Sequence, residues 1–361
     1  MGDKKKIGIL TLHRSFNYGA VWQCWALKRA CEQLGCEVEI IDFNPFGRYT
    51  IKNMLRHSPY VAYRYIAHMH LFSRFLKNRL NLTTYSESNE WIQKNPPLDD
   101  IYIVGSDMVW SNSLVDEYLD SYLLNFAPSG VKRISYAAST GGKCLELKDY
   151  QLAELRKFSA ISVREKQSVQ DVQQKVIIPV VDVCDPTILL SKETYALEEE
   201  KPLCLPKRYV AYFNLAGDRV CEESAKLLGE KLGVPIVNIG GKYQSWARNY
   251  PAPTPEQWLY IIHHADYVCG TSFHVVAFAI LFQSPFVYCA PEVKGHSTNV
   301  GRIMNMLEQT HFMHRYIANA AQITNELLDE NRDLINNISY VEAYRNRSFD
   351  WLKNALESET N

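Results

Sequence analysis

Apolar and polar residues alternate in blocks at the start of the chain. Residues 6–12 form a short apolar run that is typical of a buried strand. After a polar loop, apolar side chains recur at helical spacing from residue 20 to 34, and Gly35 is a common helix stop. A second apolar run at 36–41 predicts another strand. This strand–helix–strand unit predicts a parallel sheet with right-handed crossovers.

The same alternation continues along the chain in two sets. The first set predicts strands at 101–104, 134–138, 160–163 and 177–181. The second set predicts strands at 209–213, 235–239, 267–269 and 286–288, with helices at 220–232, 255–264 and 274–282. We therefore predict an α/β protein of two Rossmann-like, doubly wound lobes facing a cleft, with ligands bound at the carboxyl ends of the strands.

The domain boundaries follow from the segments that break the alternation. An acidic segment that ends in proline, 198–202, is typical of a linker. We expect an N-terminal lobe over residues 1–200 and a C-terminal lobe over 201–337. A basic helical insertion at about 45–95 interrupts the first lobe, and a last helix at 338–358 is expected to pack back on that lobe.

Composition excludes several classes of protein. The 361 residues carry 39 Lys and Arg against 40 Asp and Glu, a balance that argues against a disordered chain or a nucleic-acid partner. We expect no signal peptide, because the apolar run at 7–12 is too short for its core, and the most apolar later stretch, 275–282, is too short to cross a bilayer. The nine cysteines form no CxxC or Cys/His pattern, so we expect reduced thiols, a cytoplasmic protein and no metal site.

One segment has an unusual charge. Residues 43–86 contain no acidic residue. The basic residues in this segment are Arg48, Lys52, Arg56, Arg64, Arg74, Lys77 and Arg79. They form either the solvated face of an ordinary helical insertion or a peripheral contact, through residues 48–80, with anionic lipid on the inner face of the cytoplasmic membrane.

Two motifs that could bind a ligand or take part in catalysis follow predicted strands in the first half of the chain. Asn17, Tyr18 and Gly19 open the first helix, where free N–H groups suit an anion, although the same residues also suit a simple turn. Asp107 follows a buried strand within Gly-Ser-Asp. Its carboxylate is placed either to bind or deprotonate a sugar hydroxyl or to cap a helix.

Two further motifs lie in the first set. Ser139 precedes a pair of glycines in a small-residue turn that lets a ligand approach the backbone. Arg164 ends an apolar strand, a position where a guanidinium needs an oxyanion. That partner is either a bound carboxylate or phosphate, or one of the chain's own side chains, Glu165 or Asp185.

The fifth motif lies in the second set. Ser272 and His274 stand between a predicted strand and an apolar helix. His274 is therefore a candidate general acid or anion ligand, against the alternative of a purely structural histidine.

The motifs occur in an order that resembles the polysaccharide pyruvyl transferase family. The matching pieces are Ile7–Leu12, Asn17–Ala20, Phe75–Thr83, Val104–Trp110, Ser135–Ser139, Ile161–Ser168, Asp185–Thr187, Ala265–Val268, Thr271–His274, Ala277–Phe278 and Gly301–Ile303. The resemblance runs from residue 7 to about residue 310.

The resemblance implies a fold and a reaction. The fold is similar to the two-lobed glycosyltransferase B architecture. The reaction transfers the three-carbon unit of phosphoenolpyruvate (PEP) to two hydroxyls of a hexose in a polysaccharide or lipid-linked oligosaccharide, forming a cyclic ketal and releasing phosphate. By resemblance, Arg164 holds the PEP carboxylate or phosphate, and His274 binds phosphate or delivers a proton. PEP is then a co-substrate, and no cofactor is expected.

This chemistry requires an acid, a base near the acceptor and a phosphate cradle. The candidates are His274, Asp107, and the helix end at 17–19 together with Arg302. The chain departs from the family pattern at Met108 and at Val275–Val276, where many relatives have Gln and Gly-Thr. These departures either alter the choice of acceptor or mark a member with reduced activity.

Two other functions stay open at this point. A nucleotide-sugar glycosyltransferase uses the same two-lobed scaffold, and fold alone does not select the donor. A non-catalytic glycan-binding protein is the second alternative, because the departures from the pattern lie near the expected site.

Overall fold

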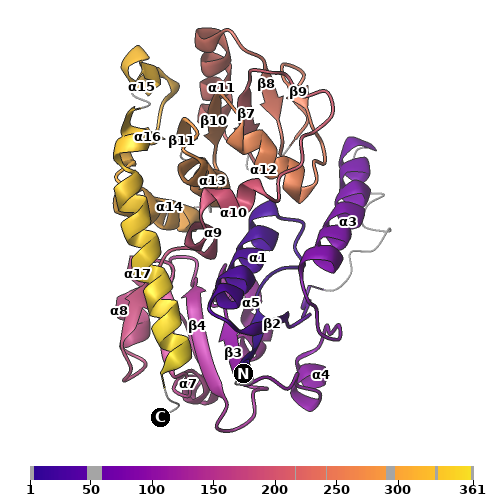
Figure 1. The fold of residues 1–361 in the computed structure, drawn as a ribbon, viewed down its shortest axis with the longest axis vertical. Helices are drawn as coiled ribbons and strands as arrows, with labels where there is room; N and C mark the ends of the chain where they lie inside the picture. The colour runs from indigo at the N-terminus through magenta and orange to yellow at the C-terminus, as the bar shows by residue number, and fades with distance from the viewer. Residues whose placement is uncertain are drawn as a thin grey trace. The chain divides into compact units, whose positions relative to one another are not determined.

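The computed structural model describes residues 4–46, 59–215, 217–240, 242–289, 297–329 and 332–358. The chain divides into two compact units, each built around a sheet (Figure 1). Unit 1 comprises residues 1–49, 74–190 and 344–361, and unit 2 comprises 50–73 and 191–343.

Unit 1 contains a six-stranded parallel sheet in the order β2-β1-β3-β4-β5-β6. Its strands are β1 (Lys6–Leu10), β2 (Glu37–Ile40), β3 (Ile101–Val104), β4 (Lys132–Ala138), β5 (Ala160–Val163) and β6 (Val180–Asp182). Every residue of β3 and β4 is buried. A parallel sheet covered on both faces requires such runs, because neither face meets water.

Helices cover this sheet. They are α1 (Tyr18–Gln33), α4 (Asn89–Lys94), α5 (Asn112–Val115), α6 (Leu119–Tyr122), α7 (Asp149–Leu155), α8 (Lys166–Gln173) and α9 (Pro186–Leu189). Helix α1 packs against α9 and is buried on most of its surface.

Two long helices contribute residues to both units, α3 (Pro59–Arg79) and α17 (Ile338–Glu357). From Tyr344 onward, α17 belongs to unit 1. The backbone N–H of Cys184 donates to the Ser348 hydroxyl (2.9 Å), and Lys132 donates to the carbonyl of Leu356 (3.4 Å). The C-terminal helix is thus fixed to the unit 1 sheet by buried polar contacts.

Unit 2 contains a second six-stranded parallel sheet, in the order β12-β11-β10-β7-β8-β9. Its strands are β7 (Val210–Phe213), β8 (Ile236–Asn238), β9 (Arg248–Asn249), β10 (Tyr267–Gly270), β11 (Phe286–Cys289) and β12 (Tyr316–Ile317). Its helices are α10 (Lys192–Ala196), α11 (Arg219–Leu232), α12 (Pro255–His263), α13 (Phe273–Phe282), α14 (Ser297–Gln309), α15 (Asn325–Asp329) and α16 (Arg332–Asn336). All ten residues of α13 are buried, which makes it the central helix of this unit.

The alternation of apolar runs predicted these elements well. Each predicted strand and helix has a counterpart in the structure, shifted by a few residues at most. The two-residue strands β9 and β12 are too short to leave a pattern. The division between the units falls at 190–191, and residues 59–73 of the expected insertion group with unit 2, while residues 47–58 lie outside the described ranges. The cleft expected between the lobes stays a prediction.

Gly105 immediately follows β3 and offers a test of this packing. Its φ is +122°, and a Cβ added there would lie 2.0 Å from the backbone carbonyl oxygen of Tyr136. Replacing Gly105 by Ala should lower the free energy of unfolding by more than about 3 kcal/mol, because backbone atoms of β4 must move.

Gly130 is the matched control. Its φ is +81°, but nothing lies within 4 Å of an added Cβ. Gly130→Ala should lower the free energy of unfolding by only about 1–2 kcal/mol, because only the left-handed backbone conformation is strained. Urea unfolding of both variants measures the difference, and equal losses would contradict this packing.

Candidate functional site

Charged side chains gather at one edge of the unit 1 sheet. Asp107 follows β3, Arg164 follows β5, and Asp185 follows β6. Because parallel strands end at the same edge, these side chains meet there, at the edge where doubly wound sheets bind ligands.

Arg164 is the centre of this group and is only 2% exposed. Its Nη1 donates to Oδ2 of Asp185 at 2.8 Å, and its Nη2 lies 3.6 Å from Oδ1 of Asp107. Burial alone would lower the pKa of Arg164, but the carboxylates of Asp185, Asp107 and Glu165 raise it above its ordinary value. The sequence left open whether Arg164 pairs with a bound anion or with a side chain of the chain itself, and in the structure Asp185 is such a partner.

Asp185 is held on both carboxylate oxygens. The Ser106 hydroxyl donates to Oδ2 (3.0 Å), the atom that also accepts from Arg164. The backbone N–H and the hydroxyl of Thr187 donate to Oδ1 at 3.0 and 2.8 Å. Asp185 therefore fixes the position of the guanidinium and caps α9 with the same side chain.

Asp107 is held differently. Its side chain is 16% exposed, compared with 2% for Arg164 and none for Asp185. Its distance of 3.6 Å from Arg164 is longer than a hydrogen bond. Its φ of +70° turns the loop sharply, and its backbone carbonyl accepts from Ser139 N–H (3.0 Å). It caps no helix, because α5 begins only at Asn112.

Ser139 is fully buried beside Glu165. Its hydroxyl donates a short hydrogen bond to the Glu165 carboxylate and accepts from the N–H of Gly141 (3.1 Å). The hydroxyl of Ser168 also donates to Glu165 (3.3 Å). The structure thus uses Ser139 to support Glu165 within the protein.

Gln23 is a member of this group that the sequence analysis missed. The side chain is fully buried on α1, where its Nε2 donates to the Thr11 hydroxyl (2.9 Å) and its Oε1 accepts from Ser106 N–H (3.2 Å). The available signal was a lone amide within the otherwise apolar run 20–27.

The loop before α1 carries the residues predicted to bind an anion. Asn17 is the N-cap of α1, and its side chain accepts from the N–H of Gly19 (2.9 Å). Tyr18 is 3% exposed. Asn17 therefore makes the turn, the simpler of its two expected roles.

Asp42, which follows β2, binds His13 and Arg14 at the start of this loop. Its Oδ1 contacts Nε2 of His13 (3.1 Å) and accepts from Nε of Arg14 (2.6 Å). Burial alone would raise the pKa of Asp42, but the contacts with His13 and Arg14 outweigh it, so the pKa falls below its ordinary value of 3.8.

Three predicted residues lie in unit 2. Ser272 is the N-cap residue of α13, and His274, 6% exposed, lies in the first turn of that helix. Arg302 lies on α14, which packs against α13, and is 7% exposed. Burial raises the pKa of Tyr288, and the charge of Arg302 partly offsets that rise, which places Arg302 near β11. Ser272 and His274 thus stand at the start of α13, after β10, and Arg302 lies on the neighbouring helix α14.

The basic segment is described only in part, because residues 47–58 lie outside the described ranges. Within α3, Phe72 and Phe75 are buried, and Phe75 meets Trp22 edge to face. Tyr63 and Ile66 are exposed by 61% and 58%. Contact with anionic lipid stays a prediction. Among the described residues, no helix combines the length and apolar character that spanning a bilayer requires.

Comparison with known proteins assigns the family. The sequence model of polysaccharide pyruvyl transferases matches residues 17–292. The chain belongs to the polysaccharide pyruvyl transferase family. The resemblance found in the motifs is thereby confirmed, and the family indicates a pyruvyl transferase. No curated protein sequence matches the chain.

Solved structures assign the fold. A protein from Listeria monocytogenes assigned as a UDP-N-acetylglucosamine 2-epimerase has a TM-score of 0.54 at 10% identity, with 99% of each chain covered. UGT89C1 from Arabidopsis thaliana, complexed with quercetin, has a TM-score of 0.50 at 10% identity, covering 97% of this chain and 99% of its own. The predicted glycosyltransferase B class of fold is confirmed.

The contacts of Asp42 generate a pH-dependent prediction. Because its pKa is lowered in the folded state, its stabilising contribution is complete above the ordinary value of 3.8 and is lost as the pH falls through the lowered value. Asp42→Asn should therefore lower the free energy of unfolding by about 2–4 kcal/mol at pH 7, and by progressively less below about pH 4. Urea unfolding of the wild type and the variant at several pH values measures this difference.

Asp149, exposed at the start of α7, is the control for this series. Asp149→Asn should stay within about 0.5 kcal/mol of the wild type at pH 7. A gap for Asp42→Asn that stays constant between pH 7 and pH 3 would contradict the assigned ion pair.

Proposed function

We propose that this chain transfers the three-carbon unit of PEP to two hydroxyls of one hexose, in a polysaccharide or lipid-linked oligosaccharide, with release of phosphate. One observation carries the proposal: in a member of this family, a buried guanidinium is fixed by Asp185 beside the partly exposed Asp107, at the edge where doubly wound sheets bind ligands. The product would be a cyclic pyruvate ketal.

Binding of PEP needs positive charge, because PEP carries up to three negative charges. Arg164 supplies that charge, and Asp185 holds it in place. The contact with Asp107 is the weaker one, at 3.6 Å. We infer that a carboxylate or phosphate oxygen of PEP displaces Asp107 from Arg164, since a bidentate oxyanion pairs better with a guanidinium than a distant carboxylate does.

The displaced carboxylate then has a role of its own. Released from Arg164, Asp107 is placed to accept the proton of an acceptor hydroxyl. The hydroxyl oxygen forms a bond to C2 of PEP while C3 gains a proton and becomes a methyl group. A second hydroxyl then attacks C2, the bond from C2 to the phosphate oxygen breaks, and phosphate leaves with the electron pair. One proton from the two hydroxyls replaces the proton given to C3, and the other leaves with phosphate.

Unit 2 carries the other residues that the family resemblance assigns to phosphate binding and proton transfer. His274 lies at the amino end of the ten-residue helix α13, where backbone N–H groups and the helix dipole favour anions. We propose that His274 protonates C3 or binds phosphate, and that Ser272 and Arg302 support the phosphate. The buried Val275 and Val276 leave His274 as the polar side chain within that helix.

The donor is tested directly by ligand-dependent stability and turnover. PEP should raise the melting temperature of the full chain, because a ligand stabilises the folded state that binds it. Phosphate release should require PEP and a glycan acceptor together. If sugar nucleotides raised the melting temperature and PEP did not, the chain would be a glycosyltransferase. Glycan binding without turnover of any donor would identify a binding protein.

Two variants separate the proposed roles of Arg164 and Asp107. Arg164→Lys keeps the charge but loses the planar fork, so the Kd for PEP should rise roughly 10- to 100-fold. Asp107→Asn removes the base and the competing carboxylate. It should therefore bind PEP at least as tightly as the wild type, while turnover falls by about 10²- to 10⁴-fold. Calorimetric titration with PEP and a phosphate-release assay measure both.

Arg315 provides a matched control for the loss of a buried arginine. It is fully buried in unit 2 and pairs with Asp333 at 2.7 and 2.8 Å. Arg315→Lys should lower the melting temperature without changing the Kd for PEP. The assignment fails if Arg164→Lys and Arg315→Lys leave PEP binding equally intact, or if Asp107→Asn turns over within a few-fold of the wild type.

A further inference from the structure

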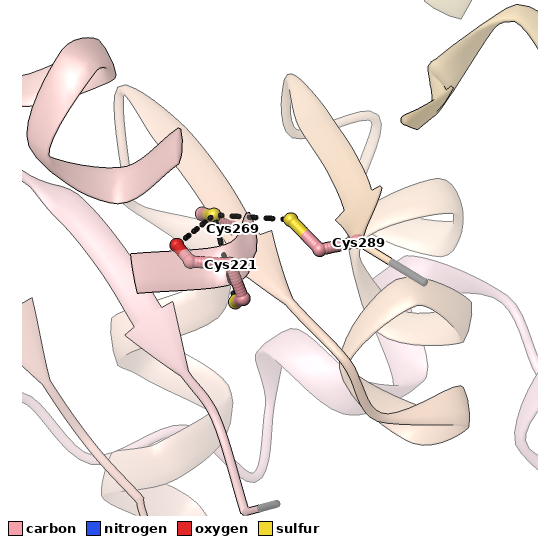
Figure 2. A group of neighbouring side chains, drawn as sticks. All are labelled: Cys221, Cys269 and Cys289. Atoms are coloured by element: carbon pink, nitrogen blue, oxygen red, sulfur yellow. Dashed lines mark hydrogen bonds between the residues drawn. The ribbon is translucent and has the colours of Figure 1, made fainter. Parts of the chain in front are cut away.

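Three cysteines from three elements converge inside unit 2. Cys221 lies on α11, Cys269 on β10, and Cys289 is the last residue of β11. Figure 2 shows the sulfur of Cys269 linked to both of the others. The Sγ atoms of Cys269 and Cys221 are 3.8 Å apart, and those of Cys269 and Cys289 are 3.7 Å apart. All three residues are fully buried.

The sulfur spacing fits a metal ion. Zinc binds thiolate sulfur at about 2.3 Å in a tetrahedral arrangement, which separates neighbouring sulfurs by about 3.8 Å. Both measured separations agree with that edge length, and the three sulfurs all lie within 4.8 Å of one another. One ion can therefore contact all three sulfurs after only small shifts.

The arrangement differs from that of an isolated buried cysteine. Lone buried cysteines are common, and Cys24 and Cys31 in unit 1 are examples that join no group of potential metal ligands within the described ranges. The unit 2 cluster brings three thiols into an apolar core, where the S–H of Cys269 donates to the carbonyl oxygen of Cys221 (3.5 Å). An apolar core offers few hydrogen-bond acceptors for the S–H groups of three thiols.

A neighbouring hydroxyl can also support a bound thiolate. Ser224 lies one turn after Cys221 on α11, and its hydroxyl is buried. That hydroxyl adjoins Cys289 and can donate to a bound thiolate, as groups around a metal commonly do.

We propose that Cys221, Cys269 and Cys289 form a binding site for one thiophilic metal ion of the Zn²⁺ type. The site would be structural, because it joins α11 to β10 and β11 inside the core. Cys269 precedes the Gly270–Ser272 loop that leads to His274, so the ion would fix the base of that loop. The proposal rests on sulfur geometry and does not depend on the proposed function.

The test uses the full chain carrying Cys144→Ser and Cys204→Ser, which removes the two exposed cysteines of the described ranges. The protein is loaded with Zn²⁺, dialysed and analysed for metal content and by X-ray absorption at the zinc edge. We expect about one zinc per chain and three sulfurs at about 2.3 Å. Loading should raise the melting temperature by several degrees, because the ion binds the folded state.

Two further substitutions in the same background serve as test and control. Cys289→Ser should reduce the bound zinc at least about fivefold, because only two of the three thiolates remain. Cys24→Ser removes a buried thiol in unit 1 and should leave the zinc content unchanged. If Cys289→Ser does not fold, the sulfur count of its parent decides the question.

Three results would overturn the proposal. The first is a zinc shell of nitrogen and oxygen only, which would place the ion at Glu199, His263 and His264, the other group of potential ligands among the described residues. The second is an equal zinc content in Cys289→Ser. The third is no zinc retained above the level of a buffer control.

Discussion

A guanidinium buried in a protein needs a carboxylate partner, and the candidate site is organised around that need. Removing a charge from water costs several kcal/mol, and the buried Arg164 at the end of β5 offsets that cost first through its pair with Asp185 and then through Asp107 and Glu165. Asp185 is in turn held by Ser106 and Thr187. This one ion pair therefore joins the loop after β3 to the ends of β5 and β6.

Asp107 gains its proposed role from the same pair. Because Asp185 occupies the strong position on Arg164, Asp107 is left with a longer contact and more exposure to solvent. In the proposed function, PEP displaces Asp107 from the guanidinium while Asp185 keeps Arg164 in place, although both are aspartates beside one arginine.

The sequence predicted the scaffold better than it predicted the contacts. Apolar runs located the strands because both faces of a parallel sheet are covered. Arg164 is a candidate because a guanidinium at the end of an apolar strand needs an oxyanion, and Asp107 because a carboxylate just past a strand is well placed for a ligand. Their spacing does not say which aspartate binds the guanidinium. Gln23 was missed, because it is a single amide within an apolar helical run. The cysteines at 221, 269 and 289 form no ligand pattern in the sequence, since ligands brought together by folding leave no local motif.

The most direct test of this account is a crystal structure of the chain with PEP bound. The account predicts an oxygen of PEP within hydrogen-bond distance of Arg164 Nη2, the bond from Arg164 to Asp185 unchanged, and the Asp107 carboxylate moved away from the guanidinium. PEP bound elsewhere, with the contact between Arg164 and Asp107 preserved, would contradict it.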